Sequence, residues 1–397
     1  MKIVHVTGYF VPELGYQEYY LAKKHAQMGH DVHVITSDFF YPFPNIESML
    51  KEAGIKDTSR KRKAGFSTVD GIKVHRLKSF FEYSDFILCT GLKEALMKIK
   101  PDVVFSHESR QGLTTLAARY KKLLGYRLVV DQHDFHHEIP NHPILKKFLR
   151  EIDYKLFRKF VVNYSLKRAD KIIAVTEETK KFLINEHKIS PKRLTMVPLG
   201  VDTDFFSFDK KSRESTRKKY GIGPGEILFT FSGTIVRRKG LELLLDAFSE
   251  INDANSKLMI VGGGDKGYVD ELKKIASRQN IGNRIIFTGF VKKEEVKSYF
   301  SASDAAVWPG NNSVSIIEAM ACRLPVIIAD MQLAHLTDFE NGIKFPEHDK
   351  QKLISAMEKL LKNKPLRQKM SLNSLKAAKS NYSYDSIAKK FIEISVS

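Results

Sequence analysis

Residues 307–330, VWPGNNSVSIIEAMACRLPVIIAD, decide the fold class. The apolar run Ala305–Trp308 predicts a strand, and the Gly/Asn/Ser turn after it leads into a helical pattern over Ser313–Cys322. Pro325 then opens a second apolar run. The stretch therefore predicts a strand, loop, helix, strand unit of an α/β protein.

The loop of this unit is a candidate anion site. Ser313 is expected to cap the helix, so that unpaired backbone N–H groups and the positive helix end face a ligand above the sheet. Glu318 lies five residues into the helix among apolar neighbours, too far along to act as a cap. A carboxylate in such surroundings needs a partner.

Short Val/Ile-rich runs alternate with helical patterns along the whole chain, which is typical of parallel sheets with helices on both faces. A first series of strands is predicted at Ile3–Thr7, Val32–Thr36, Ile72–Leu77, Val103–Ser106, Arg127–Asp131, Ile172–Thr176 and Leu194–Pro198. A second series is predicted at Ile227–Ser232, Lys257–Val261, Arg284–Thr288, Ala305–Trp308, Val326–Ala329 and Ile343–Phe345. The charged stretch 200–226, with Gly-Pro-Gly at 223–225, is expected to be the linker between them.

Bulk properties agree with two soluble domains. The 397 residues are too many for one ordinary core, and 43% hydrophobic with 28% charged residues is typical of globular proteins. No run approaches the roughly 20 apolar residues of a membrane-spanning helix, and MKIVHVTGYF reads as a strand rather than a signal peptide. We therefore expect a cytoplasmic protein. Two distant cysteines, Cys89 and Cys322, argue against disulfides, and no histidine spacing predicts a metal site.

The net charge of +19 favours anionic partners. Residues 1–200 hold 34 Lys/Arg against 22 Asp/Glu, and residues 201–397 hold 31 against 24, so the first half carries more of the excess. Nucleotides, phospholipid surfaces and nucleic acid all fit this charge, and so does a basic composition kept for solubility. Without any RNA- or DNA-binding motif, we expect no nucleic-acid partner.

Pro143–Lys171 is the most basic amphipathic stretch, with nine Lys/Arg against three Asp/Glu and apolar residues at helical spacing. Such a helix fits an anionic membrane face, where the protein would be peripheral. A helix packed on the core with a charged outer side fits equally. Two aromatic clusters, Phe39–Phe43 and Phe80–Phe86, are predicted to lie in loops as satellites of the core.

Two features of the first half lie where open α/β sheets bind ligands, at the carboxyl ends of strands. The first strand runs into a glycine-containing turn that ends at Gly15, just before the helix Tyr16–Met28. A glycine in such a turn is explained by phosphate binding, and equally by the backbone conformation that a tight strand-to-helix turn requires. His133 follows the strand Arg127–Asp131, as a candidate polar contact or proton-handling group, or as a structural histidine bonded to Asp134 or to backbone.

In the second half, the strand end at Phe231 turns at Gly233 and delivers three cations, Arg237, Arg238 and Lys239, just before a helix over Leu241–Glu250. Cations are unfavourable at the positive, N-terminal end of a helix unless an anion compensates their charge. Arginine and lysine together suit a diphosphate. Further glycine turns, at 262–264 and 289–290, are expected on the same sheet edge.

Taken in order, YFVPELG, GHDVHVIT, DQHD, VPLGVDTDFF, SGTIVRRKG, LMIVGGGD, RIIFTGFV and IIEAMACRLPVI resemble family 4 glycosyltransferases of the GT-B fold, over nearly the whole chain. The resemblance implies two facing Rossmann-like domains with mostly parallel sheets and a deep interdomain cleft. Residues 1–203 would form the acceptor-side domain and 204–383 the nucleotide-sugar domain, with the helix 384–397 packing back on the first. It also implies a retaining transferase that uses a UDP- or GDP-sugar and no essential metal or cofactor. Its acceptor would be a glycan or a lipid-linked acceptor, in cell-surface polysaccharide or glycoconjugate synthesis.

The resemblance also implies roles for single residues. Lys239 matches the lysine on the donor diphosphate, Glu318 the glutamate that holds the ribose hydroxyls, and His133 the histidine that contacts the donor sugar. His133 and Lys239 are thus the expected catalytic residues, and Gly15 falls in the glycine loop of the first domain. The remaining donor contacts would come from Gly233, Thr234, Arg238, Gly289, Phe290, Val291, Asn311, Asn312, Ser313 and Val314.

Two positions depart from the family pattern. Gly310 stands where the family has a first glutamate, eight residues before Glu318, and Thr234 stands where many members have an arginine. These departures keep an alternative open. In that alternative the protein is a non-catalytic nucleotide-sugar-binding or partner subunit of a glycosyltransferase complex.

Overall fold

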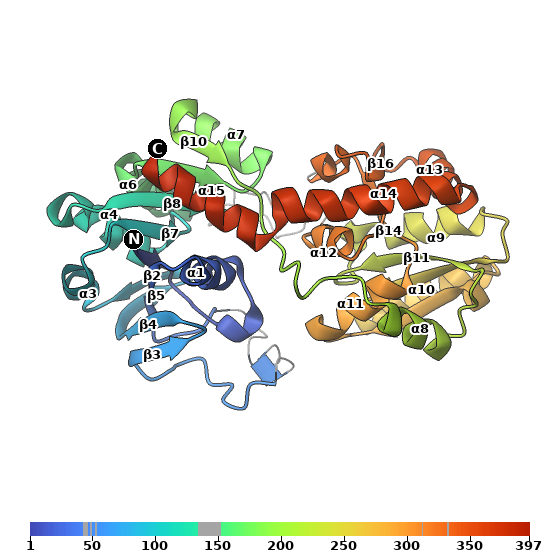
Figure 1. Cartoon of the computed structure of the whole chain (residues 1–397), viewed down its shortest axis with the longest axis horizontal. Helices are drawn as coiled ribbons and strands as arrows, with labels where there is room; N and C mark the ends of the chain where they lie inside the picture. The colour runs from blue at the N-terminus through green and yellow to red at the C-terminus, as the bar shows by residue number, and fades with distance from the viewer. Residues whose placement is uncertain (43–46, 48–49, 52–53, 134–151, 312, 332) are drawn as a thin grey trace. The chain divides into compact units, whose positions relative to one another are not determined.

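The computed structural model describes residues 1–42, 47, 50–51, 54–133, 152–311, 313–331 and 333–397 (Figure 1). Its contacts divide the chain into two compact units. The first unit comprises Met1–Leu199 and Ile387–Ser397, and the second comprises Gly200–Ser386. The division thus falls a few residues before position 203, and most of the last helix belongs to the first unit.

The first unit is built on an eight-stranded sheet with the order β10-β9-β8-β7-β1-β2-β4-β3. All neighbouring strands run parallel except β3, which is antiparallel to β4. The strands are β1 (Lys2–Val6), β2 (Asp31–Ser37), β3 (Gly65–Val69), β4 (Ile72–Leu77), β7 (Val103–His107), β8 (Arg127–Gln132), β9 (Lys171–Ala174) and β10 (Leu194–Met196).

Helices cover both faces of this sheet. Successive residues of its strands point to opposite faces, and apolar residues on both faces need to be covered. Val4 joins one core cluster and Ile3 the other. The second of these clusters contains Ile387 and Phe391 of α15 (Tyr384–Val396), so the C-terminal helix is part of the first unit's core. The other helices of the unit are α1 (Gln17–Gln27), α3 (Leu92–Ile99), α4 (Gly112–Leu124), α6 (Lys159–Arg168) and α7 (Glu177–Asn185).

The second unit holds a six-stranded, fully parallel sheet with the order β13-β12-β11-β14-β15-β16. Its strands are β11 (Ile227–Ser232), β12 (Ser256–Val261), β13 (Ile285–Gly289), β14 (Ala305–Trp308), β15 (Val326–Ala329) and β16 (Gly342–Phe345). Its helices are α8 (Lys210–Lys219), α9 (Leu241–Ser249), α10 (Lys266–Arg278), α11 (Lys293–Ala302), α12 (Ser315–Ala321), α13 (Lys350–Lys362) and α14 (Lys364–Ala377). Two Rossmann-like α/β units are therefore confirmed, as the sequence predicts.

Every predicted strand is present, with small shifts at the ends. Three short strands were not predicted, β3 and the antiparallel pair β5 (Ser79–Tyr83) and β6 (Phe86–Cys89). The aromatic cluster at 80–86 is therefore a hairpin, and placing it in a loop was wrong. In the other aromatic cluster, Phe39–Phe43, Phe40 is buried with Val11 and Leu50. Phe43 lies outside the described residues.

The expected linker at 200–226 is also wrong, because these residues belong to the second unit and include α8. Arg213 and Arg217 of this helix donate to the two carboxylate oxygens of Asp304, at 2.7 and 3.2 Å. Leu228 N–H donates to the same carboxylate at 2.8 Å, which joins α8 to the start of β11. Hydrogen bonds to charged groups contribute about 1.5 to 3 kcal/mol each, so charged residues here mark a packed helix.

Candidate functional site

The second unit has a topological switch point between β11 and β14. From β11 the chain moves to β12 and β13 on one side and returns to β14 on the other. Open α/β sheets bind ligands at the carboxyl ends of the strands that flank such a point. The loops that leave β11 and β14 are the ones for which the sequence predicts donor contacts.

These two loops are joined by hydrogen bonds. The indole N–H of Trp308 and the hydroxyl of Ser315 both donate to the carbonyl of Ser232, at 3.1 and 3.0 Å. The backbone N–H of Asn311 donates to the carbonyl of Arg238 at 2.9 Å. The sequence predicts that these two stretches, about 70 residues apart, share one site, and in the structure they are in direct contact.

Lys239 lies inside this junction. It is only 6% exposed, and its ammonium group donates to the carbonyl of Asn311 at 2.7 Å. Burial, and then the nearby Arg238, lower the pKa of Lys239 from 10.5 to about 8. Lys239 ends the short turn Arg237–Lys239, directly before α9, where a cation is unfavourable unless an anion compensates it.

Gly310 packs against the backbone of the neighbouring loop. A Cβ at Gly310 would lie 2.7 Å from the carbonyl carbon of Lys239 and 2.8 Å from the carbonyl oxygen of Arg238. No side chain fits there unless the backbone moves. The two loops approach so closely at this position that it has room for glycine but not for a glutamate side chain. Asn311, beside it, is partly exposed, and Asn312 lies outside the described residues.

Glu318 is a half-buried carboxylate on α12. Burial raises its pKa from 4.5 to about 7, against the opposing charge of Lys293. Among the described residues, no group hydrogen-bonds to this carboxylate, so it is available to hydroxyl groups of a ligand. The expectation that Ser313 caps this helix is wrong: Val314 is the N-cap, and the Ser313 hydroxyl bonds with that of Ser315 at 2.6 Å.

The glycine turns of this edge pack against one another. A Cβ on Gly262 would lie 2.1 Å from the carbonyl oxygen of Gly233, and one on Gly264 would lie 2.2 Å from that of Ile235. Gly289 follows in the next turn, where Phe290 is 61% exposed and Val291 half-buried. An exposed ring in this turn suits a base-stacking wall. The Gly262–Gly264 turn shapes the edge although the sequence reasoning gave it no ligand contact.

The cations near Lys239 differ in their partners. Arg237 forms ion pairs with Glu242 and Glu271 and lies 4.7 Å from the centre of the Tyr268 ring. Arg238 is exposed, and no ion pair engages its side chain in the part of the chain that the structure describes. Arg238 is therefore the arginine that remains able to meet a diphosphate. Thr234 is exposed nearby in the same loop.

In the first unit, His133 follows β8. Its ring Nε2 lies 3.4 Å from a carboxylate oxygen of Asp131, and its backbone N–H donates to Glu108 at 3.1 Å. Burial alone would lower the pKa of His133, but the carboxylates of Asp131, Glu108 and Glu18 outweigh it and raise the pKa to about 9. The sequence singled out the histidine and missed these three carboxylates, which come from three different elements.

Gly15 closes the short turn Pro12–Leu14 before α1, with a left-handed backbone and its N–H donating to Pro12. Its position at the carboxyl edge of the first sheet agrees with the predicted glycine loop. No group of three or more His, Cys, Asp or Glu residues in the described ranges is arranged to hold a metal ion. Within the same ranges, no helix has the length and apolarity needed to cross a membrane.

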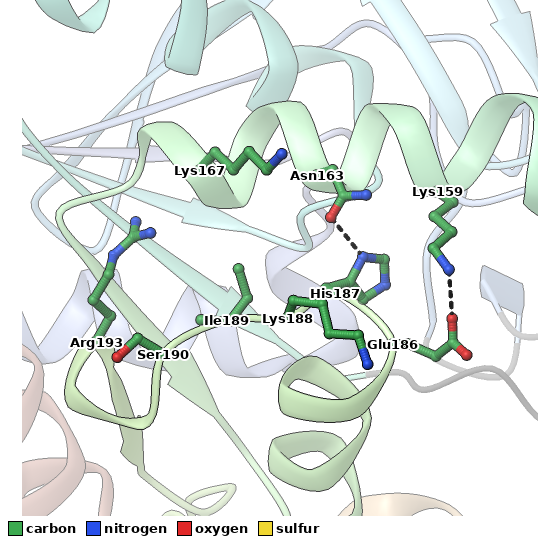
Figure 2. Close-up of a pocket in the computed structure, with 9 residues that line it drawn as sticks. All are labelled: Lys159, Asn163, Lys167, Glu186, His187, Lys188, Ile189, Ser190 and Arg193. Atoms are coloured by element: carbon green, nitrogen blue, oxygen red, sulfur yellow. Dashed lines mark hydrogen bonds and ion pairs between the residues drawn. The ribbon is translucent and has the colours of Figure 1, made fainter.

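A basic pocket of about 480 Å³ also lies in the first unit, between α6 and the segment after α7. Lys159 and Lys167 come from α6, and Lys188 and Arg193 from the other side (Figure 2). Only Glu186 opposes these four cations, and it pairs with Lys159 at 2.7 Å. The pocket is therefore a cationic hollow away from the carboxyl edge of the sheet.

The second of the two Rossmann-like units carries, at its switch point, a buried lysine, packed glycine turns and the Glu318 carboxylate, which has no hydrogen-bond partner among the described residues. This combination is typical of nucleotide-binding α/β proteins, and two such units are typical of the GT-B fold. Comparison with known proteins identifies the family. The sequence profile of the glycosyl transferases group 1 matches residues 212–377, and that of glycosyltransferase family 4 matches residues 17–205. The chain belongs to the family 4 glycosyltransferases.

Individual relatives are distant. The chain is 24% identical over 268 residues to alpha-D-kanosaminyltransferase of Streptomyces kanamyceticus, covering 66% of this chain and 68% of that enzyme. It is 25% identical over 341 residues to alpha-monoglucosyldiacylglycerol synthase of Acholeplasma laidlawii, covering 81% and 78%. The crystal structure of Anabaena HepE in complex with UDP aligns over 99% of both chains, with a TM-score of 0.69 and 17% identity.

Gly310→Ala tests the packing of the two loops. Because the new Cβ would meet backbone at 2.7 Å, we expect the loop to move and Lys239 to lose its bond to Asn311. The melting temperature should fall by several degrees, and nucleotide binding measured by calorimetry should weaken at least tenfold. Gly282→Ala is the matched control, since nothing lies within 4 Å of its Cβ. Equal behaviour of the two variants would contradict the packing argument.

Proposed function

We propose that the protein transfers a sugar, with retention of anomeric configuration, from a UDP- or GDP-sugar to a glycan or lipid-linked acceptor, in cell-surface polysaccharide or glycoconjugate synthesis. The observation that carries the proposal is the buried Lys239 beside Arg238 at the switch point, where the Lys239 ammonium group bonds the Asn311 carbonyl at 2.7 Å and burial lowers its pKa. A diphosphate would bring negative charge to these two neighbouring cations. Glu318 then accepts hydrogen bonds from the ribose hydroxyls, and Phe290 stacks on the base.

The chemistry needs charge stabilisation above all. Breaking the bond between sugar and phosphate builds negative charge on the diphosphate and positive charge on the sugar. Fixed donors aimed at the leaving group contribute about 3 to 4 kcal/mol each, by analogy with oxyanion holes. Lys239 and Arg238 supply such donors from this chain's own residues. The acceptor hydroxyl attacks from the face that the phosphate leaves, and the phosphate takes its proton.

His133 is proposed to contact the transferred sugar. Held as an imidazolium beside Asp131, its ring would donate a hydrogen bond to a sugar hydroxyl. Related proteins support the substrate classes. One solved relative binds UDP, and the names of two curated relatives include a diacylglycerol glucoside product and a GDP-mannose donor.

A non-catalytic nucleotide-sugar-binding subunit is the second candidate, favoured by Gly310. The close packing at Gly310 leaves no carboxylate at that place to hold the donor sugar. Such a subunit would bind nucleotide through Lys239 and Glu318 and would transfer no sugar by itself. Transfer that appears only when another protein is added would favour this candidate.

Lys239→Met and Glu318→Gln test the donor site. We expect the panel UDP, GDP, UDP-glucose and GDP-mannose to include a nucleotide that raises the melting temperature of the native protein, because a ligand that binds only the folded state stabilises it. Lys239→Met should abolish this rise and lower transfer by about 100- to 1,000-fold. Glu318→Gln should weaken binding about tenfold, since an amide oxygen is a poorer acceptor than a carboxylate.

Arg237→Ala is the control for these variants. Arg237 carries the same charge two residues from Lys239, but its guanidinium is held by Glu271. Its replacement should leave both nucleotide binding and transfer near the native values. Native-like turnover in Lys239→Met and Glu318→Gln would show that the donor binds elsewhere.

The basic surface around α6 leads us to propose peripheral binding to an anionic membrane. Residues 143–151 of the predicted amphipathic stretch lie outside the described residues, and the rest forms the helical turn Tyr154–Arg158 and α6. Val162 and Leu166 pack in the core, as the core-packed alternative expects. Leu156 and Phe160, however, are 78% and 69% exposed, one helical turn apart.

Leu156 lies in the helical turn that leads into α6, and Phe160 lies on α6 together with Lys159 and Lys167 of the basic pocket. Interfacial helices combine such residues, because apolar groups enter the lipid while lysines meet anionic headgroups. Each cation near an anionic surface contributes about 1 kcal/mol. The surface therefore fits a phospholipid face, and a lipid-linked acceptor would be presented there.

Leu156→Asp/Phe160→Asp tests this surface. We expect native protein to cosediment with phosphatidylglycerol vesicles at low salt and to be released at high salt, and the double variant to bind at least tenfold more weakly. Leu372→Asp is the control, because Leu372 is 63% exposed on α14 in the other unit. Equal sedimentation of the native protein with phosphatidylcholine vesicles would contradict the anionic-surface assignment.

A further inference from the structure

A line of buried imidazoles crosses the first unit's sheet and ends beside His133. A carboxylate oxygen of Asp131 on β8 lies 2.8 Å from Nδ1 of His107 on β7, whose Nε2 lies 2.9 Å from Nδ1 of His5 on β1. Nε2 of His5 lies 3.1 Å from Nδ1 of His25 on α1, and Nε2 of His25 lies 3.1 Å from the carbonyl of Ala388 on α15. All four side chains are at most 4% exposed. The line thus joins three neighbouring strands and two helices.

Counting hydrogen atoms fixes the charge of this line. It contains four contacts, and each contact needs one hydrogen to be a hydrogen bond. The carbonyl at one end and the ionised carboxylate at the other only accept. Three neutral imidazoles supply three hydrogens, so all four contacts are satisfied only when one histidine is an imidazolium. The geometry therefore requires one positive charge within the line.

His107 is the histidine that carries this charge. Burial lowers the pKa of His5 well below 6.5 and that of His25 to about 4. Burial also acts against the charged form of His107, but Asp131 outweighs it and raises the pKa of His107. Burial by itself would raise the pKa of Asp131, and the facing imidazoles of His107 and His133 hold it well below its usual range.

Asp131 is therefore shared between two histidines. The oxygen that faces His107 is also the one that lies 3.4 Å from the ring of His133. Its other oxygen accepts from the backbone N–H of Glu108 at 3.3 Å, which fixes the plane of the carboxylate. Among the described residues, the charged groups that face His133 are Asp131, the His107 imidazolium, Glu108 from the end of β7, and Glu18 from α1. His133 is thus held at the end of a network whose other end is anchored to α15.

Such a network is costly if it serves only to fill the core, since well-packed apolar residues often replace buried ion pairs at no loss of stability. Metal binding does not explain it, because the rings form a line and, in the described parts of the chain, no three of these side chains converge as ligands. Among the described residues, His133 is the member of this network that lies after the strand end at the carboxyl edge of the sheet. The network is therefore placed to hold the His133 ring at a ligand-binding edge.

We propose that Asp131, backed by the His107 imidazolium and the His5–His25 line, is the positioning residue that holds the ring of His133 and its positive charge at the ligand-binding edge of the first sheet. The proposal rests on the proposed function for the role of His133 toward the donor sugar. Asp131 fixes the ring orientation, His107 keeps Asp131 ionised and in place, and the Ala388 carbonyl sets the direction of the hydrogen bonds along the line.

Nitrogen-15 NMR spectroscopy of the histidine rings, in the full chain without donor, tests this proposal. The His133 signal is assigned by its loss in His133→Gln. We expect His133 to titrate near pH 9. His107 should carry a proton on both ring nitrogens at neutral pH, as the number of hydrogen bonds in the line requires. In Asp131→Asn the His133 pKa should fall to 6.5 or below, because the ring loses its nearest negative charge.

His107→Asn should not lower the His133 pKa. The amide still donates to Asp131, but the competing positive charge is gone, so the His133 pKa should stay at its native value or rise. A lowered His133 pKa in Asp131→Asn, without a lowered pKa in His107→Asn, cannot come from general loosening of the fold. His75→Asn is the matched control, since His33 and His75 form a similar pair at 2.9 Å on β2 and β4 without a link to His133.

If a variant fails to fold, the His133 pKa and the charge of His107 in the native protein still test the proposal. A native His133 that titrates near 6.5, or a neutral His107, would overturn the proposal. So would an unchanged His133 pKa in folded Asp131→Asn. Nucleotide-induced stabilisation is measured separately. A high His133 pKa without nucleotide binding would refute the proposed function alone, and nucleotide binding with an ordinary His133 pKa would refute the inference alone.

In transfer assays, the positioning role predicts that Asp131→Asn lowers kcat at least tenfold and leaves the KM for the donor within about threefold of the native value. Because loss of folded protein would also lower the apparent kcat and leave KM unchanged, kcat is referred to the folded fraction measured by circular dichroism. The His75→Asn control should keep the native kcat and KM.

Discussion

The close contact of backbone with backbone at the carboxyl edge of the second sheet is the constraint on which the candidate site depends. Gly310 lies against residues 238–239, and Gly262 lies against the carbonyl of Gly233, with no room for a side chain at either place. Because the loops approach this closely, the carbonyl of Asn311 reaches the ammonium group of Lys239. A buried cation is thereby fixed at the edge where we propose that the donor diphosphate binds, and burial lowers its pKa.

The same principle, a charge held in place before the ligand arrives, appears in different form in the first unit. There the fixed charge is that of His133, and the support consists of side chains in place of close backbone contacts. Asp131, His107 and the two histidines beyond them span three strands and end on the C-terminal helix. Preorganised charges of this kind need no rearrangement during the reaction, which is why they are effective in transfer chemistry.

Much of the fold is predictable from local pattern, because buried parallel strands read as short apolar runs and each predicted run is a strand. The errors have physical causes. In the hairpin at 79–89, β5 is aromatic and largely exposed, and the buried β6 is only four residues long, so neither strand has the signature of a long buried strand. Helix α8 is rich in charge and looks like a linker, because its stability comes from Arg213 and Arg217 reaching Asp304, some 90 residues away. Likewise, Lys239 and Glu318 follow from motif and resemblance, whereas the histidine line depends on strand order, which sequence spacing does not reveal.

Hydrogen exchange measured by mass spectrometry, with and without the nucleotide that stabilises the protein, tests the central claim most directly. If the glycine-packed edge of the second sheet binds the donor diphosphate, exchange should slow by at least tenfold in peptides covering 232–241 and 309–318, with a further decrease at 289–291. Exchange in helix α13 should not change. Nucleotide binding that leaves the first two peptides unprotected would contradict the account.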